Sequence, residues 1–557
     1  MTEASMFKEH PRGLIVAFFA NMGERFGFYT MMAILVLFLQ ARFGLDSDKS
    51  GAIYSVFYFL IYALALVGGI IADKTRNYKR TILAGIIIMF LGYVLMAIPG
   101  TGLPIALTGL FTIALGNGMF KGNLQAVVGQ MYDDPKYNHL RDSAFSLFYM
   151  GINIGAVFAP NAARSVRTWY LGTQGLKYDA DLPALCHQFV AGNTDNASRL
   201  QEIASLVSGG QVSDLGAFAR NYLEVFSTGY NMAFGIAAGA MLISLATFVI
   251  FKKFLPDPKA KARPGEAGEA MPWDAEKKRL MALGLVFLVV IFFWMSFHQN
   301  GLTMTFFARD YTAKSVDPLS YLVFDIKGLL LIAAMIAGVV VAIQKGTVVR
   351  RLVGSGMAVA GAVLIWFLYG SYKPENLLEP EVFQQFNPYF VVFLTPVVVG
   401  LFALLRARNR EPSTPKKIGI GMLLAATGFT LLMLASFGLP SAAELGGGPS
   451  PDRVSPNWLI TTYFILTVAE LFLSPMGLSF VSKVAPPRFQ GLMQGGWLGA
   501  TALGNQLLVV GSLMWARFDV WTVWAVFVVC CLISATVIFS MSGWLNRMTG
   551  AGSPKAQ

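Results

Sequence analysis

The chain has 557 residues, of which 55% are hydrophobic and only 13% are charged, and its formal net charge is +12. Soluble proteins carry about twice that share of charged residues, so the composition excludes a soluble globule and indicates an α-helical protein with many membrane spans. The basic residues occur in short runs between apolar segments, as in loops inside a cell, and form no continuous patch that would indicate a nucleic-acid partner. Three cysteines give neither a disulfide framework nor a metal-ligand spacing.

The first apolar run, Gly13 to Leu39, is long enough to cross a bilayer and contains the adjacent pair Glu24 and Arg25. Ionised side chains at that depth are costly and usually mark a polar pathway. In a helix, Arg25 shares one stripe with Asn21 and Tyr29, and Glu24 lies on the neighbouring stripe. This stripe is expected to face protein or water, and the alternative is a buried ion pair that only locks two helices together.

Five further spans complete the first half of the chain, and two of them carry polar residues. Lys121 lies too far from either end of its span to reach the membrane surface, so it must pair or face water. Asn153 lies among small residues that allow close helix contact. Residues 165–228 turn polar and are expected to form a partly helical external insertion. The predicted spans are Ile53–Ala72, with tyrosines on one ridge, Thr81–Ile98, Leu103–Met131, Ala144–Ala163 and Tyr230–Phe251.

A polar segment, residues 252–279, is expected to link this half on the cytoplasmic side to a second half, residues 280–557. His298 is the only one of the four histidines inside a predicted span, and Glu470 lies near the middle of another. The spans are Leu280–Ala308, Leu319–Ile343, Leu352–Tyr369, Tyr389–Leu405, Ile418–Phe437, Trp458–Val481, Leu492–Trp515 and Trp521–Trp544. About fourteen spans of roughly twenty residues place both termini and the basic loops in the cytoplasm.

Several separated segments match one family in order. Asn21 to Tyr29 resembles the signature Glu-x-x-Glu-Arg-Phe-x-Tyr-Tyr, with Asn21 in place of the first Glu and Phe28 in place of the first Tyr. The sequence therefore resembles the proton-dependent oligopeptide transporter family of the major facilitator superfamily. The other matching segments are Gly68–Asp73, Lys121 with its flanking glycines, Phe148–Gly155, Asn387-Pro388, Glu470–Gly477 and Lys483–Pro486.

The resemblance implies an all-α fold of two six-helix bundles around a cavity that opens alternately to either side. Residues 1–251 would form the first bundle and residues 280–557 the second. Residues 319–370 would add an extra transmembrane hairpin, expected to face lipid because it lacks charge in mid-span. The implied location is the plasma membrane of a bacterium, its inner membrane.

The resemblance also implies import of di- and tripeptides together with protons, and no cofactor beyond the coupling proton. Arg25 and Lys121 would hold the peptide carboxylate, and Glu470 would hold its ammonium group. The polar side chains of Asn153 and Asn387 would bind the peptide backbone. The aromatic walls of the peptide site would be formed by Tyr29, Tyr62 and Trp497. The alternative for these aromatic side chains is helix packing.

Two carboxylates of the family pattern are missing, at Asn21 and at His298, so proton coupling is expected to rest on Glu24 and His298. A histidine side chain has an ordinary pKa of about 6.5 and can change charge near physiological pH. The alternative is a neutral histidine that is hydrogen-bonded between the bundles. Other functions left open are transport of another small anion such as nitrate, and a receptor or scaffold of the same fold. No nucleophile-base or metal-ligand motif indicates an enzyme.

Overall fold

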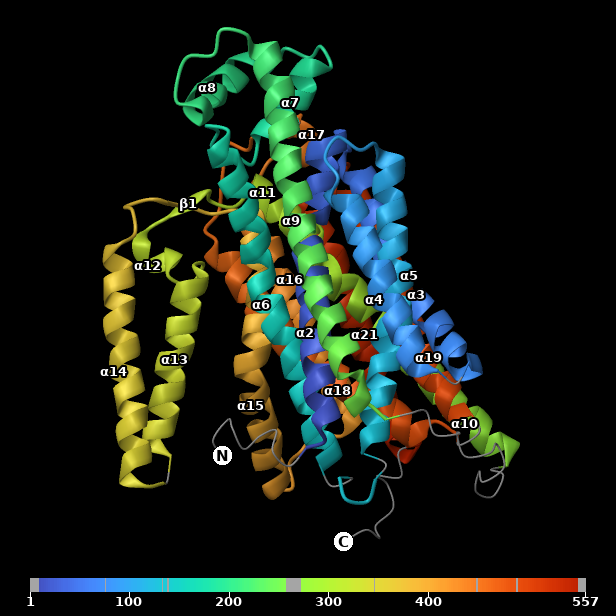
Figure 1. Cartoon of the computed structure of the whole chain (residues 1–557). Helices are drawn as coiled ribbons and strands as arrows, with labels where there is room; N and C mark the ends of the chain where they lie inside the picture. The colour runs from blue at the N-terminus through green and yellow to red at the C-terminus, as the bar shows by residue number, and fades with distance from the viewer. Residues whose placement is uncertain are drawn as a thin grey trace.

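The computed structural model describes residues 10–75, 77–132, 134–137, 140–256, 272–344, 346–446, 449–486 and 489–548. The protein is built almost entirely of long helices that run side by side (Figure 1). We call the end that carries the short helices α7 (Leu182–Val190) and α8 (Ala197–Ser208) the upper end, and the opposite end the lower end. Helix α2 begins and α21 ends at the lower end.

Each half of the chain contributes six long segments. In the first half these are α2 (Arg12–Phe43), α3 (Ser47–Thr75), α4 (Tyr78–Ala97), α5 (Leu103–Met131), α6 (Arg141–Thr173) and α9 (Leu215–Phe251). In the second half they are α10 (Trp273–Phe297), continued by η3 (His298–Gly301) and α11 (Thr303–Asp310); α15 (Phe386–Ala407), preceded by η4 (Pro380–Gln385); α16 (Thr414–Ala435); α18 (Asn457–Val484); α19 (Gln490–Gln506), continued by α20 (Val509–Trp515); and α21 (Val520–Met548).

Thirteen helical segments of the described chain are long and apolar enough to cross a membrane. Helix α6 is not among them, yet it packs along α2 and α9 within the first half. With α6 the segments correspond to the predicted spans. The prediction of an all-helical, multi-pass membrane protein is confirmed.

Glycines in the predicted motifs bring helices of the first half into close contact. A Cβ atom on Gly68 of α3 would lie 2.2 Å from the carbonyl oxygen of Gly118 of α5. On the other side of α5, a Cβ atom on Gly116 would lie 2.6 Å from the carbonyl oxygen of Gly85 of α4. Small residues at such contacts let backbones approach closely, which is a main source of helix association in membranes. These glycines thereby fix the position of Lys121, one turn further along α5.

The bounds of the predicted external insertion differ from the structure. Helix α6 continues to Thr173 and α9 already begins at Leu215, so both ends of residues 165–228 belong to long helices. The polar residues did not end α6, because Arg167 is buried against two acidic residues of the second half. Only residues 174–214, with α7 and α8, form a cap on the upper end (Figure 1).

Helices α13 (Ile326–Ile343) and α14 (Val348–Gly370) form a hairpin that stands beside the bundles, next to α15 (Figure 1). The two helices pack closely through Gly338 and Gly354, where a Cβ atom on Gly354 would lie 2.5 Å from the backbone nitrogen of Ala342. Most of their other side chains are exposed. The hairpin is attached at the upper end by α12 (Pro318–Tyr321) and by the pairing of β1 (Ser315–Val316) with β2 (Asn376–Leu377).

Candidate functional site

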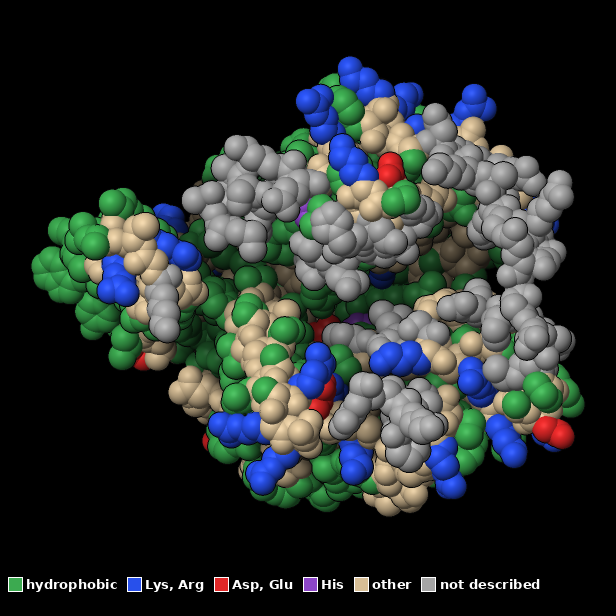
Figure 2. Space-filling model, turned by 90° about the horizontal axis from the view of Figure 1, so that it is seen from below, with side chains coloured by type: hydrophobic (Ala, Val, Ile, Leu, Met, Phe, Trp, Pro, Cys, Tyr) green, Lys and Arg blue, Asp and Glu red, His purple; other side chains and the backbone are tan. Residues whose placement is uncertain are grey.

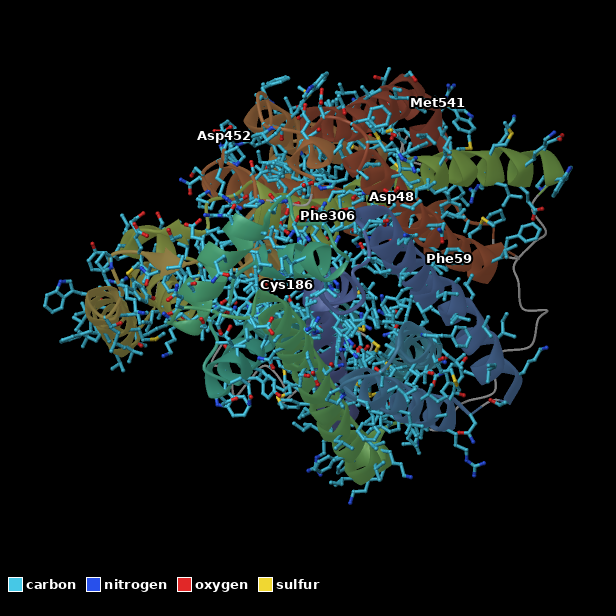
Figure 3. The ribbon with its side chains drawn as sticks, turned by 90° about the horizontal axis from the view of Figure 1, so that it is seen from above. Asp48, Phe59, Cys186, Phe306, Asp452 and Met541 are labelled. Atoms are coloured by element: carbon cyan, nitrogen blue, oxygen red, sulfur yellow. The ribbon has the colours of Figure 1, made fainter. Side chains whose placement is uncertain are left out.

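The molecule is closed at the upper end and hollowed at the lower end. Several hydrogen bonds that link described residues of the two halves lie at the upper end. A view from above (Figure 3) shows Asp48, Phe306 and Cys186 near the middle, where elements of both halves meet. The view from below (Figure 2) shows a hollow between the halves with hydrophobic, basic and acidic side chains in its depth. The linking pairs include Asn161 with Gln385, Arg167 with Glu379 and Glu381, Gln40 with Arg309, Asp48 with Arg517, and Asp181 with Lys314 and Arg453.

The predicted charged pair of the first span forms a closed unit inside the first half. The Nε and Nη2 atoms of Arg25 donate to the two carboxylate oxygens of Glu24 at 2.5 and 2.7 Å. Asn117 of α5 donates a further hydrogen bond of 2.7 Å to Glu24. The Glu24 side chain is fully buried. The Arg25 guanidinium lies 4.7 Å from the ring centre of Phe28. Glu24 therefore neutralises and orients Arg25.

Lys121 lies beside this unit without a carboxylate partner of its own. Its ammonium nitrogen is 4.3 Å from the ring centre of Tyr62, and it forms no salt bridge with any described residue. Both side chains are half-buried, as is Tyr29. A cation on an aromatic face keeps its charge available to a third group. Lys121 thus provides the uncompensated positive charge that a carboxylate ligand requires.

Glu470 supplies the opposite charge from the second half. Its Oε2 atom accepts a hydrogen bond of 3.0 Å from Asn387, which also donates to Thr467. Its Oε1 atom accepts no hydrogen bond from the described residues. The carboxylate is near enough to Tyr29 and Tyr62 of the first half to act on them electrostatically. The structure therefore brings Glu470, Lys121 and the two tyrosines into one region between the halves.

Two other predicted binding residues have local roles in this structure. The side-chain nitrogen of Asn153 donates to the carbonyl oxygen of Tyr149 in its own helix. The Trp497 side chain is only 5% exposed, and its ring lies against Gly477, where a Cβ atom would be 1.9 Å from the ring. Trp497 therefore serves helix packing in this structure, which is the alternative named above for the aromatic residues.

His298 lies where the two halves touch, at the turn between α10 and α11. Its Nδ1 atom is 2.5 Å from the side-chain oxygen of Asn505, and its ring is 4.6 Å from the rings of both Trp294 and Tyr58. Tyr58 belongs to α3 of the first half, so His298 forms part of the contact between the halves. Among the described residues the hydrogen bonds of Glu24 go to Arg25 and Asn117, and none goes to His298. The two residues predicted to couple protons thus occupy separate places.

Sequence reasoning missed the residues that orient the predicted ones. Asn117 binds Glu24, Asn505 binds the His298 ring, and Thr467 accepts from Asn387, each through one hydrogen bond. Asn117 stands between two glycines in the motif that contains Lys121, and a polar side chain inside an apolar span is the signal that could have identified all three.

The family model described as POT family matches residues 79–267 and 371–523, more than half of the chain. Dipeptide and tripeptide permease A of Cronobacter turicensis is 27% identical over 520 residues, covering 89% of this chain and 83% of that protein. The uncharacterized transporter YclF of Bacillus subtilis is 28% identical over 524 residues, covering 90% and 87%. A crystal structure of the peptide transporter POT in complex with sulfate has a TM-score of 0.67 at 21% identity, covering 97% of this chain and 96% of that chain.

The chain shares its fold of two helical halves with that solved structure, and thirteen helical segments of its described residues are long and apolar enough to cross a membrane. The chain belongs to the POT family. The resemblance seen in the motifs is confirmed.

Proposed function

We propose that the protein imports di- and tripeptides together with protons by alternating access. A short peptide is a zwitterion whose ends carry opposite charges whatever its side chains are. Lys121 on the first half has no carboxylate partner among the described residues, and Glu470 on the second half keeps one carboxylate oxygen without a donor. These two unused charges, one on each half, are the observation that carries the proposal, because they match both ends of a peptide. The similarity to proteins named dipeptide and tripeptide permease supports it.

The same charges disfavour transport of a simple anion such as nitrate. An anion would use Lys121 alone, and Glu470 would repel it from the second wall. The similarity to proteins named dipeptide and tripeptide permease likewise favours transport over a receptor that only binds. Peptide transport is therefore the function that this arrangement supports best.

The proposed proton-coupling residues are Glu24 and His298. Protonation of Glu24 would free Arg25 from its partner, and protonation of His298 would place a charge in the aromatic contact between the halves. Asn505 orients the histidine ring through Nδ1. Both events would change the balance between the open and closed states, which is what coupling requires.

We also propose that the lower end faces the cytoplasm of a bacterial cell. Figure 2 shows Lys and Arg side chains around the rim of the lower face, as the positive-inside rule requires. With the three native cysteines replaced by alanine, a single cysteine at Arg351 should react with a membrane-impermeant maleimide only in inverted vesicles. A single cysteine at Arg199 should react only in intact cells. Labelling in the reverse pattern would contradict this orientation.

The test of function is uptake of labelled dialanine by the purified protein in proteoliposomes, with unlabelled dipeptides, nitrate and free amino acids as competitors. We expect competition by di- and tripeptides alone. Lys121→Ala should abolish uptake while the variant still inserts into the membrane, because the carboxylate end loses its partner. Competition by nitrate together with no uptake of dipeptide would instead favour transport of a small anion.

A further inference from the structure

A cavity of about 320 Å³ lies at the upper end, between the cap of residues 174–214 and two loops of the second half. We call it the outer cavity. Its lining comprises Asp181 and Arg199 of the cap, and Lys314, residues 449–451 and Arg453 of the second half. Three of these four charged side chains are basic. The outer cavity is separate from the hollow of the lower end and from the motifs that the sequence singled out.

Arg453 is held firmly and keeps one edge of its guanidinium for the outer cavity. Its Nη1 atom donates to the carbonyl oxygens of Arg309 and Thr312 at 3.0 and 2.9 Å. Among the described residues its Nη2 atom has only Asp181, whose two carboxylate oxygens both lie at 3.5 Å. That distance is beyond the usual range for a hydrogen bond. A guanidinium that is already fixed in place loses little freedom when it binds a ligand.

The single carboxylate of the lining does not neutralise the outer cavity. The Oδ2 atom of Asp181 accepts a hydrogen bond from Lys314, whose ammonium nitrogen also lies 3.4 Å from Asp179. An ammonium group has three protons, so Lys314 keeps one donor beyond these two contacts. Arg453 shares the same Asp181 carboxylate only at the longer distance. The wall formed by the second half therefore retains donors for a further acceptor.

Arg199 adds a positive charge that can turn toward a ligand. It pairs with Glu202 at 2.7 Å, three residues further along α8, and the two side chains are 45% and 58% exposed. A solvent-exposed pair of this kind contributes little to stability, so the oxygens of a ligand can replace Glu202.

Residues 449–451 form a wall of the outer cavity that carries no acidic side chain. Pro449 and Pro451 restrict the backbone of this segment. Between them, the buried Ser450 donates a hydrogen bond of 2.7 Å from its hydroxyl to the carbonyl oxygen of Asp452. The outer cavity is thus a small, preformed space with donors from both halves, which suits an anion.

We propose that the outer cavity is an external binding site for a small oxyanion, whose carboxylate, phosphate or sulfate oxygens accept hydrogen bonds from Arg199, Lys314 and Arg453. Arg199 belongs to the first half and the other two to the second, so the bound oxyanion bridges the halves. Separation of the halves breaks up the site. The oxyanion therefore binds the closed upper end more tightly and shifts the equilibrium toward it. The site goes beyond the proposed function, and only its effect on transport rests on alternating access.

The test of binding is a calorimetric titration of sulfate into the purified protein in detergent at constant ionic strength. Because the hollow offers Lys121 to an anion, every protein in the test carries Lys121→Ala. We expect saturable binding that Arg199→Gln weakens about fivefold, the upper range for one solvent-exposed charge. Arg199→Lys keeps the charge and should bind nearly as well. The control Arg220→Gln, exposed near the start of α9 at the same end, should leave the affinity unchanged.

Equal affinity in Arg199→Gln and in the protein that carries Lys121→Ala alone, or no saturable binding, would overturn the proposal. Competition then identifies the source of the oxyanion. Displacement of sulfate by phosphate and not by dialanine would support an inorganic ligand, whereas displacement by dialanine would support the carboxylate of a peptide.

The effect on the upper end is tested by distance. Spin labels would be placed on cysteines at Thr101, in the loop between α4 and α5, and at Asp519, which precedes α21, in a chain without native cysteines. In double electron–electron resonance, saturating sulfate should raise the short-distance population relative to the long one by about fivefold, the share of the affinity that Arg199 provides. Sulfate binding without this change would refute the bridging role. Absence of dialanine uptake alongside both expected results would refute the peptide function and support the site.

Discussion

Glu470→Gln removes the negative charge of the hollow and leaves its shape nearly unchanged. In the structure Asn387 binds only Oε2, so Oε1 is available to a peptide ammonium group. A hydrogen bond to a charged group contributes roughly 1.5 to 3 kcal/mol, which corresponds to about a tenfold to 150-fold change in affinity. We expect the affinity for dialanine, measured by competition against a labelled dipeptide in proteoliposomes, to weaken within this range, and concentrative uptake to be lost.

The matched control is Glu411→Gln. Glu411 lies in the loop between α15 and α16, where it accepts hydrogen bonds from Arg406 and Lys417, and these groups lower the pKa of its carboxyl to about 2. It is ionised at the pH of the assay, like a carboxylate ligand, but stands outside the hollow. Its replacement should leave dialanine affinity unchanged. Equal affinity in Glu470→Gln and the unaltered protein would refute the role of Glu470 as the ammonium partner.

Two further predictions concern packing and proton coupling. Gly477→Ala places a methyl group 1.9 Å from the Trp497 ring and should lower the free energy of unfolding by roughly 1 to 3 kcal/mol, seen as a lower midpoint of thermal unfolding in detergent. The control Gly499→Ala, whose added Cβ atom would have no atom within 4 Å, should leave the midpoint unchanged. Equal midpoints for the two variants would contradict the packing role of Trp497. His298→Gln should retain exchange of dialanine across the membrane but lose uptake driven by an acid exterior, and normal concentrative uptake would exclude His298 as a coupling residue.

Charges inside apolar spans made much of the site predictable from sequence. Arg25, Lys121 and Glu470 could be recognised because an ionised side chain at such depth requires a partner or water. That Glu24 would pair with Arg25 followed from their adjacency in the chain. The family motifs then indicated which half contributed which charge, and in the structure Lys121 lies against Tyr62 of the first half while Glu470 is bound by Asn387 of the second.

The remaining features depend on contacts between distant parts of the chain. Arg167 made residues 165–228 look like a polar insertion, because its partners Glu379 and Glu381 lie more than two hundred residues away. The position of Trp497 against Gly477 likewise depends on how α18 and α19 pack, which spacing within one helix does not indicate. Sequence pattern identifies polar residues in membrane spans, but it identifies their partners only when these are near in the chain.

Uptake of labelled dialanine into proteoliposomes under an inward pH gradient tests the central proposal most directly. We expect the unaltered protein to concentrate dialanine inside the vesicles, a proton ionophore to abolish this concentration, and Lys121→Ala and Glu470→Gln each to prevent it. Equilibration without concentration, or uptake that is unchanged in both variants, would contradict a proton-driven peptide transporter with opposite charges on its two halves.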